Sequence, residues 1–396
     1  MNWDVAEWRA RYFRLLKERL SNLQVLSSYQ LQAPIYSLSF SHLDSRWLLA
    51  SDESGLVSIL DTEETPLCPK DQFRAHNNSI FDSGWSLDGS RIMTASGDLT
   101  AAVWDIETKE AVTLSGHLGS VKCIRNSPIW RDVYISAARD DRILIWDLRE
   151  GRGSSVSPIG YISEELVKPV LGSRGKRGMQ SYTAVELLCG GHIAVSCDAH
   201  EAGLKFWDLR KMVGANPSKN KATARPRFAG SLDPLSSRRV QQAALLEQEK
   251  MSAQLLVPPT ARDTSRLEEV IEPRLSGSAS LALSPSKSQL LVTSLSNCLY
   301  VYPSINHVDT VPPLQLMGVK VSFYVRSQFS ADERFVVSGS QDGSVHIWDL
   351  EDLTWKAVLC SAHSQEVNSV SWTDTHSAFL ASCSDDREVK LWDCVL

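Results

Sequence analysis

A Trp-Asp dipeptide recurs along this chain of 396 residues, and it constrains the fold more than any other feature of the sequence. Each copy ends a short run of alternating apolar residues, as in LTAAVWD, RILIWD and SVHIWD. The five copies stand at residues 104–105, 146–147, 207–208, 348–349 and 392–393. Two degenerate copies, GLVSILD ending at Asp61 and NCLYVY ending at Tyr302, bring the number of units to seven. The spacing is 44 residues from Asp61 to Asp105, 42 from Asp105 to Asp147 and 44 from Asp349 to Asp393.

A period of about 40 to 45 residues ending in Trp-Asp is typical of one blade of a WD-repeat β-propeller. Within each unit, period-2 alternation indicates half-buried antiparallel strands separated by turns rich in Ser, Asp and Gly. One unit cannot cover both faces of its own sheet, so the units are expected to stack into a ring. Closing that ring needs an outer strand for the last unit, which we expect from residues 23–31. The predicted fold class is all-β, a seven-bladed WD-repeat propeller with a short N-terminal helix.

Residues 1–20 are predicted to form an amphipathic helix, and residues 21–396 to form the propeller. Six apolar residues recur near one stripe of the helix: Trp3, Ala6, Ala10, Phe13, Leu16 and Leu20. The stripe suits two arrangements, packing on the propeller itself or insertion into a partner protein as an anchoring helix. Polar and basic stretches interrupt the repeat twice, so loop insertions are expected at residues 150–181 and 211–274.

Three units place a His before the first strand and an Asp six residues before the Trp. With a nearby Ser or Thr, such residues resemble a hydrolase triad. Their recurrence favours a structural role, because one active site normally suffices, whereas a buried chain from Asp through His and Ser to Trp satisfies polar groups in every blade. The structural hydrogen-bond network is predicted to comprise His76, Asp98 and Trp104, then His117, Asp140 and Trp146, and finally His363, Asp386 and Trp392.

Composition narrows the classes of function. Hydrophobic residues make up 43% of the sequence, enough to bury a core, and the net charge of -6 gives no overall attraction to nucleic acid. No stretch approaches the roughly eighteen apolar residues of a membrane span, so an intracellular protein is expected. The sequence contains no CxxC pair, phosphate-binding loop, nucleophile elbow or HExxH motif. We therefore expect no catalysis, no metal and no cofactor.

Two units continue past the Trp-Asp in the same way, with WDLR at residues 146–149 and again at 207–210. The chain emerges at one rim of the ring after this strand, so Arg149 and Arg210 are expected on adjacent blades at the same rim. A guanidinium group there offers donors in a planar fork that suits the carboxylates and carbonyls of a partner. Alternatively, each Arg forms a salt bridge within its own blade. The residues alone give the two arrangements equal weight.

The sequence resembles the denticleless family of WD-repeat proteins in seven passages that occur in the same order. They are FRAHNNSIFDSGW, TASGDLTAAVWD, GHLGSVKCI, RDDRILIWDLR, LKFWDLRK, FYVRSQFSADERFVVSGSQDG and AHSQEVNSVSW. Members of that family are substrate receptors of cullin-4 RING ubiquitin ligases and deliver proteins bound to the sliding clamp PCNA. The resemblance implies contacts from Asp147, Arg149, Asp208 and Arg210 to the damaged-DNA-binding adaptor of the ligase. It also implies degron-bearing substrates from replication or the cell cycle, and localisation in the nucleus, with the cytoplasm as a second compartment.

The rim opposite the Trp-Asp turns is expected to hold the substrate peptide. Its turns precede the first strand of each unit, which makes Asn78, Tyr324 and Glu366 candidates for substrate contact; the alternative is that they only cap their own blades. A function of another class is a chromatin-associated scaffold that binds histone peptides, since an N-terminal helix before a seven-bladed ring also occurs in histone chaperones. Such proteins use acidic pockets for basic tails, and enrichment of histones without ligase subunits would favour this function.

Overall fold

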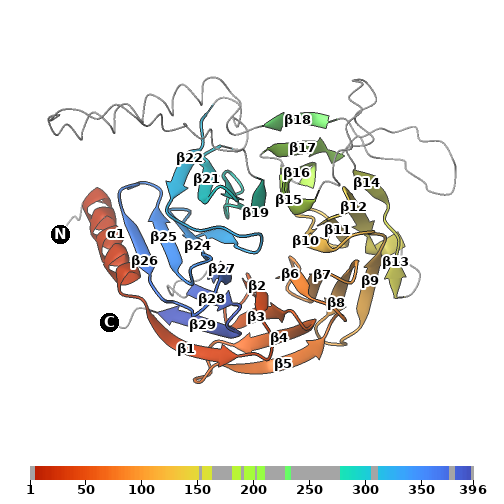
Figure 1. The fold of residues 1–396 in the computed structure, drawn as a ribbon, viewed down its shortest axis with the longest axis horizontal. Coiled ribbons are helices and arrows are strands. Elements are labelled where there is room, and N and C mark those ends of the chain that lie inside the picture. Colours follow the sequence, from red (N-terminus) through yellow and green to blue (C-terminus); the bar gives the residue numbers. More distant parts are fainter. Residues whose placement is uncertain are drawn as a thin grey trace, which may run out of the picture.

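The computed structural model describes residues 5–150, 154–162, 181–188, 191–200, 203–209, 228–232, 277–304, 311–373 and 380–393, with side chains from residue 11 onward and only the backbone at 228–232. In these residues, seven sheets stand like blades around a common centre (Figure 1). The predicted seven-bladed all-β propeller with an N-terminal helix is therefore confirmed. In each blade the strands follow one another in chain order from the centre outward, except that the outermost strand of the last blade comes from the N-terminus, and the blades follow one another in chain order.

The first three blades are formed between residues 35 and 162. Blade 1 consists of β2 (Ile35–Phe40), β3 (Trp47–Asp52), β4 (Leu56–Asp61) and β5 (Cys68–Arg74). Blade 2 consists of β6 (Ile80–Trp85), β7 (Arg91–Ser96), β8 (Thr100–Asp105) and β9 (Ala111–Ser115), and β13 (Ser155–Val156) adds a fifth strand parallel to β9. Blade 3 consists of β10 (Val121–Asn126), β11 (Val133–Ala138), β12 (Ile143–Asp147) and β14 (Gly160–Ile162).

The other four blades complete the ring. Blade 4 consists of β15 (Tyr182–Leu188), β16 (Ile193–Asp198), β17 (Leu204–Asp208) and β18 (Phe228–Leu232). Blade 5 consists of β19 (Ser278–Leu283), β20 (Leu290–Ser294), β21 (Cys298–Tyr302) and β22 (Leu314–Met317). Blade 6 consists of β23 (Ser327–Phe329), β24 (Phe335–Ser338), β25 (Val345–Asp349) and β26 (Lys356–Leu359). Blade 7 consists of β27 (Val367–Trp372), β28 (Leu380–Ser384), β29 (Glu388–Asp393) and the N-terminal strand β1 (Gln24–Gln30).

Strand β1 closes the ring. It pairs antiparallel with β29, from Gln24 opposite Asp393 to Gln30 opposite Glu388, and Figure 1 shows it along the outer edge of blade 7. The predicted outer strand from residues 23–31 is thus confirmed. The pairing covers an edge that would otherwise be open to association with another chain, and the chain then continues directly into blade 1.

Both ranges that the sequence pattern assigns to loop insertions contain outer strands. Residues 150–181 include β13 and β14, and residues 211–274 include β18, which pairs with β17. These strands are two, three and five residues long and contain Ser and Gly, so they have little or no period-2 pattern from which to predict them. Most other residues of the two ranges lie outside the described part of the chain.

Apolar side chains between neighbouring blades hold the ring together. At the closing interface, Ala381 and Leu391 of blade 7 pack with Leu48 and Leu60 of blade 1, and all four are fully buried. Similar clusters join blades 3, 4 and 5, and blades 5 and 6. Burying one Leu side chain contributes roughly 1.5–3 kcal/mol, so each blade depends on its neighbours for much of its stability.

Helix α1 (Val5–Ser21) lies against β26 on the outside of blade 6 (Figure 1). Leu20 is 0% exposed, and Phe13 and Leu16 pack on the same apolar cluster of blades 6 and 7. The ammonium group of Lys17 lies 2.9 Å from an Asp349 carboxylate oxygen. The described side chains of the apolar stripe therefore pack on the propeller itself and are not left free to insert into a partner.

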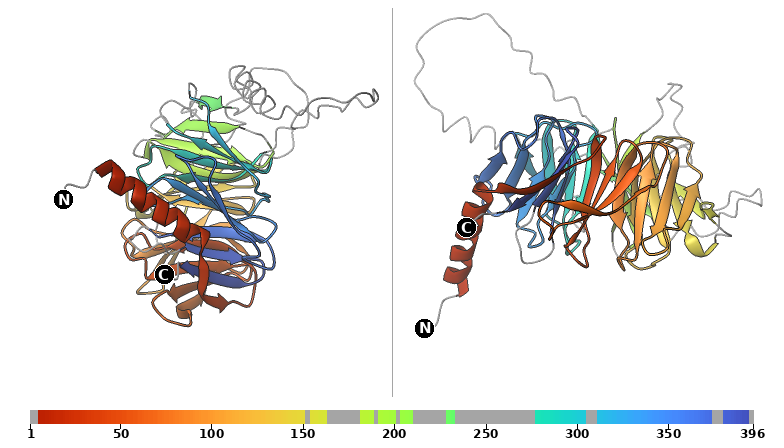
Figure 2. Two further views of the ribbon diagram at one scale, coloured as in Figure 1. Left: turned by 90° about the vertical axis from the view of Figure 1, so that its left-hand side faces the viewer. Right: turned by 90° about the horizontal axis from the view of Figure 1, so that it is seen from below.

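The N-terminal half of α1 runs beyond the edge of the ring (Figure 2). The side chains of Trp3, Ala6 and Ala10, which complete the predicted stripe, lie outside the described ones. Among the residues that the structure describes, no helix has the length and apolar character that crossing a membrane requires.

The contact between α1 and blade 6 predicts unequal effects of two similar substitutions. Leu20→Ala removes a fully buried side chain and should lower the free energy of unfolding by about 2–4 kcal/mol, because a cavity remains. Leu15→Ala on the same helix removes a side chain that is 52% exposed and should change it by less than about 0.5 kcal/mol. Urea unfolding followed by circular dichroism measures both variants. Equal midpoints for the two would show that α1 does not pack on the blade in solution.

Candidate functional site

The turns that follow the Trp-Asp dipeptides lie on one face of the ring, which we call the WD face. In blades 2, 3, 4 and 6 each contacts the turn between the first two strands of its blade: Leu148 N, for example, donates to the Asp132 carbonyl at 2.9 Å, and Leu209 N donates to the His192 carbonyl at 2.9 Å. The WD face therefore comprises residues 41–46, 86–90, 127–132, 192 and 330–334 from one set of turns, and 62–67, 106–110, 148–150, 209 and 350–355 from the other.

Arg149 and Asp147 form a two-point ion pair on the WD face. Arg149 donates from Nε to Oδ1 of Asp147 at 2.9 Å and from Nη2 to Oδ2 at 2.6 Å. The side chain of Asp147 is 10% exposed, whereas that of Arg149 is 64% exposed. The hydrogen bond from Arg149 lowers the pKa of Asp147 and keeps the carboxylate charged. The guanidinium is thus held in one orientation while its outer edge faces solvent.

The origin of this exposure is seen by comparing blades. In blade 1, Asp61 pairs with Arg46, and in blade 6, Asp349 pairs with Arg334; both arginines precede the second strand. The same place in blade 3 is occupied by Asp132, which cannot neutralise Asp147. The cation comes instead from two residues beyond the Trp-Asp, and its side chain is far more exposed than the 12% of Arg334. The two arrangements weighed for Arg149 therefore coexist: it pairs within its own blade and remains accessible.

Blade 4 repeats part of this arrangement. Asp208 ends β17 and is buried like Asp147, and His192 stands where blades 1 and 6 carry an arginine. Arg210 lies outside the described residues. The structure thus places Asp208 on the blade next to Asp147 at the same face, and contact of these residues with an adaptor stays a prediction.

An apolar groove of about 580 Å³ lies between blades 3 and 4, beside Arg149. Its lining includes Trp130, Ile145, Ile159, Leu187, His192 and Leu209. Trp130 is 46% exposed, and its ring meets that of His192 edge-on with centroids 6.1 Å apart. Other large apolar side chains are exposed on the same face, namely Leu43, Leu87 and Ile129. Apolar side chains gathered beside a charged group are typical of a protein-interaction surface.

Two of the three predicted substrate contacts, Tyr324 and Glu366, lie near the centre of the face opposite the WD face. The innermost strand of each blade begins there. The ring of Tyr324 stacks on Tyr36, with centroids 4.9 Å apart, and on Phe81, with centroids 6.1 Å apart. The carboxylate of Glu366 accepts a hydrogen bond from the hydroxyl of Ser322, which in turn accepts one from Tyr324 N at 3.1 Å. Glu366 therefore helps to position Tyr324.

Asn78 lies on the same side of the ring, in the turn before β6. Its side chain is exposed, and its Oδ1 accepts a hydrogen bond from Ser79 N at 2.8 Å. Asn78 and Glu366 both make local hydrogen bonds, as the capping alternative requires. Contact of these three residues with substrate stays a prediction.

In blade 3 a chain of hydrogen bonds links Asp, His, Ser and Trp. His117 Nδ1 lies 3.0 Å from the Asp140 carboxylate, and Nε2 lies 2.7 Å from the hydroxyl of Ser136. Trp146 Nε1 donates to the same hydroxyl at 2.8 Å. Because the carboxylate only accepts, Nδ1 carries the proton and Nε2 accepts from Ser136. Every polar group of this buried chain is satisfied, which is what a structural role needs.

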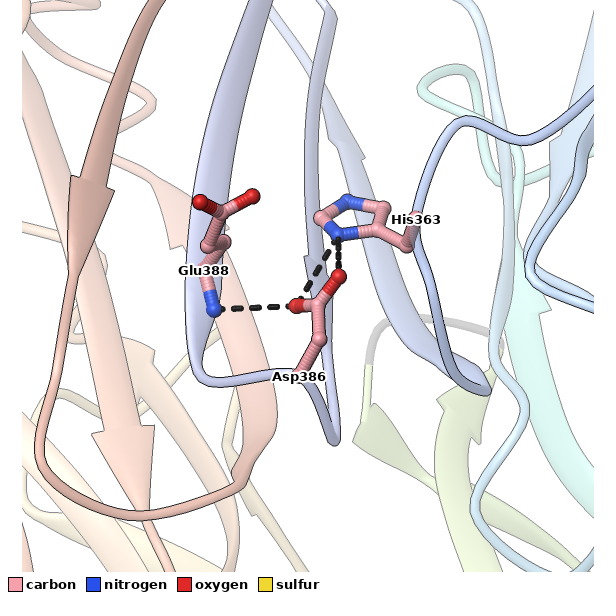
Figure 3. Close-up of side chains that lie close together, drawn as sticks. All are labelled: His363, Asp386 and Glu388. Carbon is pink, nitrogen blue, oxygen red and sulfur yellow. Dashed lines mark hydrogen bonds and ion pairs between the residues drawn. The ribbon is translucent and has the colours of Figure 1, made fainter.

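Blade 7 has the same chain. His363 lies 2.9 Å from Asp386 and 2.7 Å from the hydroxyl of Ser382, to which Trp392 Nε1 donates at 2.8 Å. Figure 3 shows the imidazole of His363 directed at Asp386, whose carboxylate also accepts a hydrogen bond from the backbone N of Glu388.

Blade 2 departs from the prediction at Trp104. His76 lies 2.9 Å from Asp98 and 2.8 Å from the hydroxyl of Thr94, but Trp104 Nε1 is buried without a hydrogen-bond partner. The inclusion of Trp104 in the network is therefore wrong. The Thr94 hydroxyl approaches a carbonyl oxygen of β8 at 3.4 Å, and the ring of Trp104 packs on Phe73 with centroids 5.0 Å apart.

His363, Asp386 and Glu388 lie close enough together to suggest a metal site among the described residues. Both nitrogens of His363 are occupied, by Asp386 and by Ser382. The carboxylate of Glu388 lies 3.0 Å from the ammonium group of Lys390. A metal ion would have to displace these hydrogen bonds, so the cluster fits the structural network better.

Known proteins match this architecture over most of the chain. The family model described as WD domain, G-beta repeat, matches residues 67–105, 321–349 and 356–393. The Denticleless protein homolog of Danio rerio is 29% identical over 376 residues, which cover 91% of this chain and 51% of the relative. The homolog of Gallus gallus is 29% identical over 89% of this chain and 46% of its own length, and that of Homo sapiens is 27% identical over 87% and 44%.

The chain contains WD repeats and is similar to denticleless proteins over about nine-tenths of its length. It spans about half the length of the curated relatives it matches. WD-repeat propellers typically serve as non-catalytic scaffolds for protein–protein interaction, in agreement with the expectation from the sequence.

A largely buried ionic layer across the centre of the propeller was not predicted from the sequence. Arg326, just before β23 of blade 6, reaches the carboxylate of Asp82 in blade 2. Arg125 lies 2.6 Å from the same carboxylate and 2.5 Å from Glu186. Burial alone would raise the pKa of Asp82, but the two guanidinium groups bring it to about 2. These charges stand on or beside innermost strands without a recurring spacing, so only their pairing in space reveals them.

The network of blade 7 predicts a pH-dependent stability. Burial alone would raise the pKa of Asp386, but the hydrogen bond with His363 brings it to about 2, below the ordinary 3.8. A carboxyl with a lowered pKa stabilises the fold above its unfolded-state pKa, and this contribution is lost as the pH falls from about 4 through about 2. The free energy of unfolding of Asp386→Asn should therefore vary less across that range than that of the wild type.

Urea unfolding at several pH values between about 2 and about 7 compares the two proteins. Glu107→Gln on an exposed turn serves as the control and should follow the wild type. If the curve for Asp386→Asn runs parallel to the wild-type curve, the hydrogen bond between Asp386 and His363 does not stabilise the blade.

Proposed function

We propose that this protein is the substrate-recognition subunit of a cullin-4 RING E3 ubiquitin ligase. The WD face docks on the damaged-DNA-binding adaptor of the ligase through the WDxR segments of blades 3 and 4. The observation that carries the proposal is the exposed two-point pair of Arg149 with Asp147, beside the apolar groove between these blades. The similarity to denticleless proteins supports it.

The geometry of Arg149 suits a protein interface. Its bond to Asp147 fixes the guanidinium plane before a partner arrives, so less side-chain entropy is lost on binding. The donors that Asp147 does not use remain available for carbonyl or carboxylate oxygens of the adaptor. Trp130 in the adjoining groove adds apolar surface, and Arg and Trp are the residue types that most often dominate the energy of an interface.

In this function the propeller carries no chemistry of its own. The ubiquitin-conjugating enzyme performs catalysis, and the receptor raises the local concentration of its substrate. Degron-bearing proteins of replication or the cell cycle, with or without PCNA, are held on the face opposite the adaptor, where Asn78, Tyr324 and Glu366 lie. The proposed place of action is the nucleus.

Loss of the two arginines tests this function. Arg149→Ala combined with Arg210→Ala should abolish co-purification with the adaptor, and Arg149→Ala alone should weaken binding at least about tenfold, because an interface arginine commonly contributes over 1.4 kcal/mol. The fold should be retained, since the Arg149 side chain is 64% exposed. Surface plasmon resonance with the purified adaptor measures the affinity.

The matched control is Arg74→Ala, which removes an exposed arginine at the outer edge of blade 1 and should leave the affinity unchanged. Undiminished binding by the double variant would refute the assignment of the WD face. Thermal unfolding of each variant separates a lost contact from a lost fold.

A further inference from the structure

A notch opens at the end of the ring's centre opposite the WD face, which we call the channel mouth. The notch has a volume of about 20 Å³, and its lining includes Tyr36, Phe81, Lys122, Arg139, Tyr324 and Arg326. Three basic side chains and four aromatic side chains, with Phe323 among the latter, meet there, and the lining contains neither Asp nor Glu. A space of this size admits one water molecule or one terminal polar group of a ligand.

Lys122 is the most unusual of these residues. It stands on β10, its side chain covers the face of Phe81, and it is only 8% exposed. Its Nζ lies 2.9 Å from the centroid of the Phe81 ring and 5.3 Å from that of Tyr324. In the described part of the chain no oxygen accepts a hydrogen bond from this amine. Burial, with repulsion from Arg139 and Arg326, lowers the pKa of Lys122 to about 6.

The other two basic side chains, Arg139 and Arg326, leave the local excess of positive charge uncompensated. Arg139, in the turn between β11 and β12, is exposed and makes no ion pair within the described residues. Arg326 is bound to Asp82, but that single carboxylate is shared with Arg125. Two acids near the notch are already engaged: Glu366 accepts a hydrogen bond from the hydroxyl of Ser322, and Glu53 accepts one from that of Tyr36. Buried polar groups in folded proteins are ordinarily hydrogen-bonded, so the amine of Lys122, which has no acceptor among the described residues, is an incomplete site. A carboxylate beside it would raise its pKa and hold it in the ammonium form.

We propose that the notch binds the carboxylate of an Asp or Glu side chain in an extended segment of a partner protein. The carboxylate accepts hydrogen bonds from Lys122 and Arg139, and the neighbouring atoms of the segment lie on Tyr36 and Tyr324. The segment belongs to the substrate, so this site extends the proposed function. The inference rests on that function only for the identity of the partner. The same charges repel the basic tails that a histone scaffold would hold.

A binding assay with three labelled peptides tests the site. Fluorescein-labelled hexaglutamate, hexalysine and hexaphosphoserine are titrated with the full chain at about 150 mM salt, where charges more than roughly 8 Å apart are largely screened. The protein has a net charge of -6, so hexaglutamate is repelled overall and binds only where cations are concentrated locally. We expect saturable binding of hexaglutamate, measured by fluorescence anisotropy, and none of hexalysine.

Two substitutions locate the binding. Lys122→Met keeps a long apolar side chain on Phe81 but removes the amine, and Arg139→Ala removes an exposed cation. Each should weaken hexaglutamate binding at least about fivefold, the loss expected for one charge-assisted hydrogen bond of about 1 kcal/mol or more. Arg131→Ala, which removes an exposed arginine on the WD face, is the control and should leave the affinity unchanged.

Several results overturn the proposal. One is the absence of saturable hexaglutamate binding. Another is an affinity for hexaglutamate in Lys122→Met and Arg139→Ala that equals that of the wild type. The third is tighter binding of hexalysine than of hexaglutamate. Hexaphosphoserine binding at least ten times tighter than hexaglutamate would assign the notch to a phosphate instead. If Lys122→Met fails to fold by circular dichroism, Arg139→Ala decides alone. The assay contains no ligase subunit, so a failed notch leaves the adaptor contact of Arg149 standing, and a failed adaptor contact leaves the notch standing.

Discussion

Apolar packing between neighbouring blades is the interaction on which the rest of this structure depends, because no blade buries both faces of its own sheet. The closing interface is the critical one, since the two ends of the propeller meet there. Leu48 and Leu60 of blade 1 pack with Leu391 of blade 7, and β1 provides the outer strand of the last blade. Once the ring is closed, side chains far apart in the sequence acquire fixed positions relative to one another.

A second constraint acts in blades 1, 3 and 6, at the aspartate that ends the third strand. Its carboxylate is buried and pairs with an arginine in each of these blades. Blades 1 and 6 provide one from the turn before the second strand, where Arg334 is largely covered. Blade 3 has Asp132 in that turn, and its cation therefore comes from Arg149, on the outer side of the third strand. A structural requirement common to several blades thus produces an exposed guanidinium in one of them.

The two faces of the ring differ in chemistry because of this local variation. The WD face combines Arg149 with an apolar groove and exposed tryptophan, whereas the channel mouth combines Lys122 and Arg139 with stacked aromatic rings. Between them, Asp82 holds Arg125 and Arg326 in a buried ionic layer. The two faces therefore offer surfaces of different character, as the proposed function requires.

Much of the architecture could be predicted from the sequence, because a repeated Trp-Asp and a period-2 pattern report burial that recurs locally in every blade. The seven blades were predicted on that basis, and so were the His, Asp and Ser-linked Trp residues that hydrogen-bond in blades 3 and 7. The closing strand was predicted because the last blade needs an outer strand, and the helix from its apolar stripe. Only the tertiary structure decided that Trp104 stays outside such a network, that Arg149 is both paired and exposed, and that Lys122 is a buried amine without an oxygen partner among the described residues. These properties depend on which side chains from different strands and blades meet in space, and the charge and burial that result have no periodic signature along the chain.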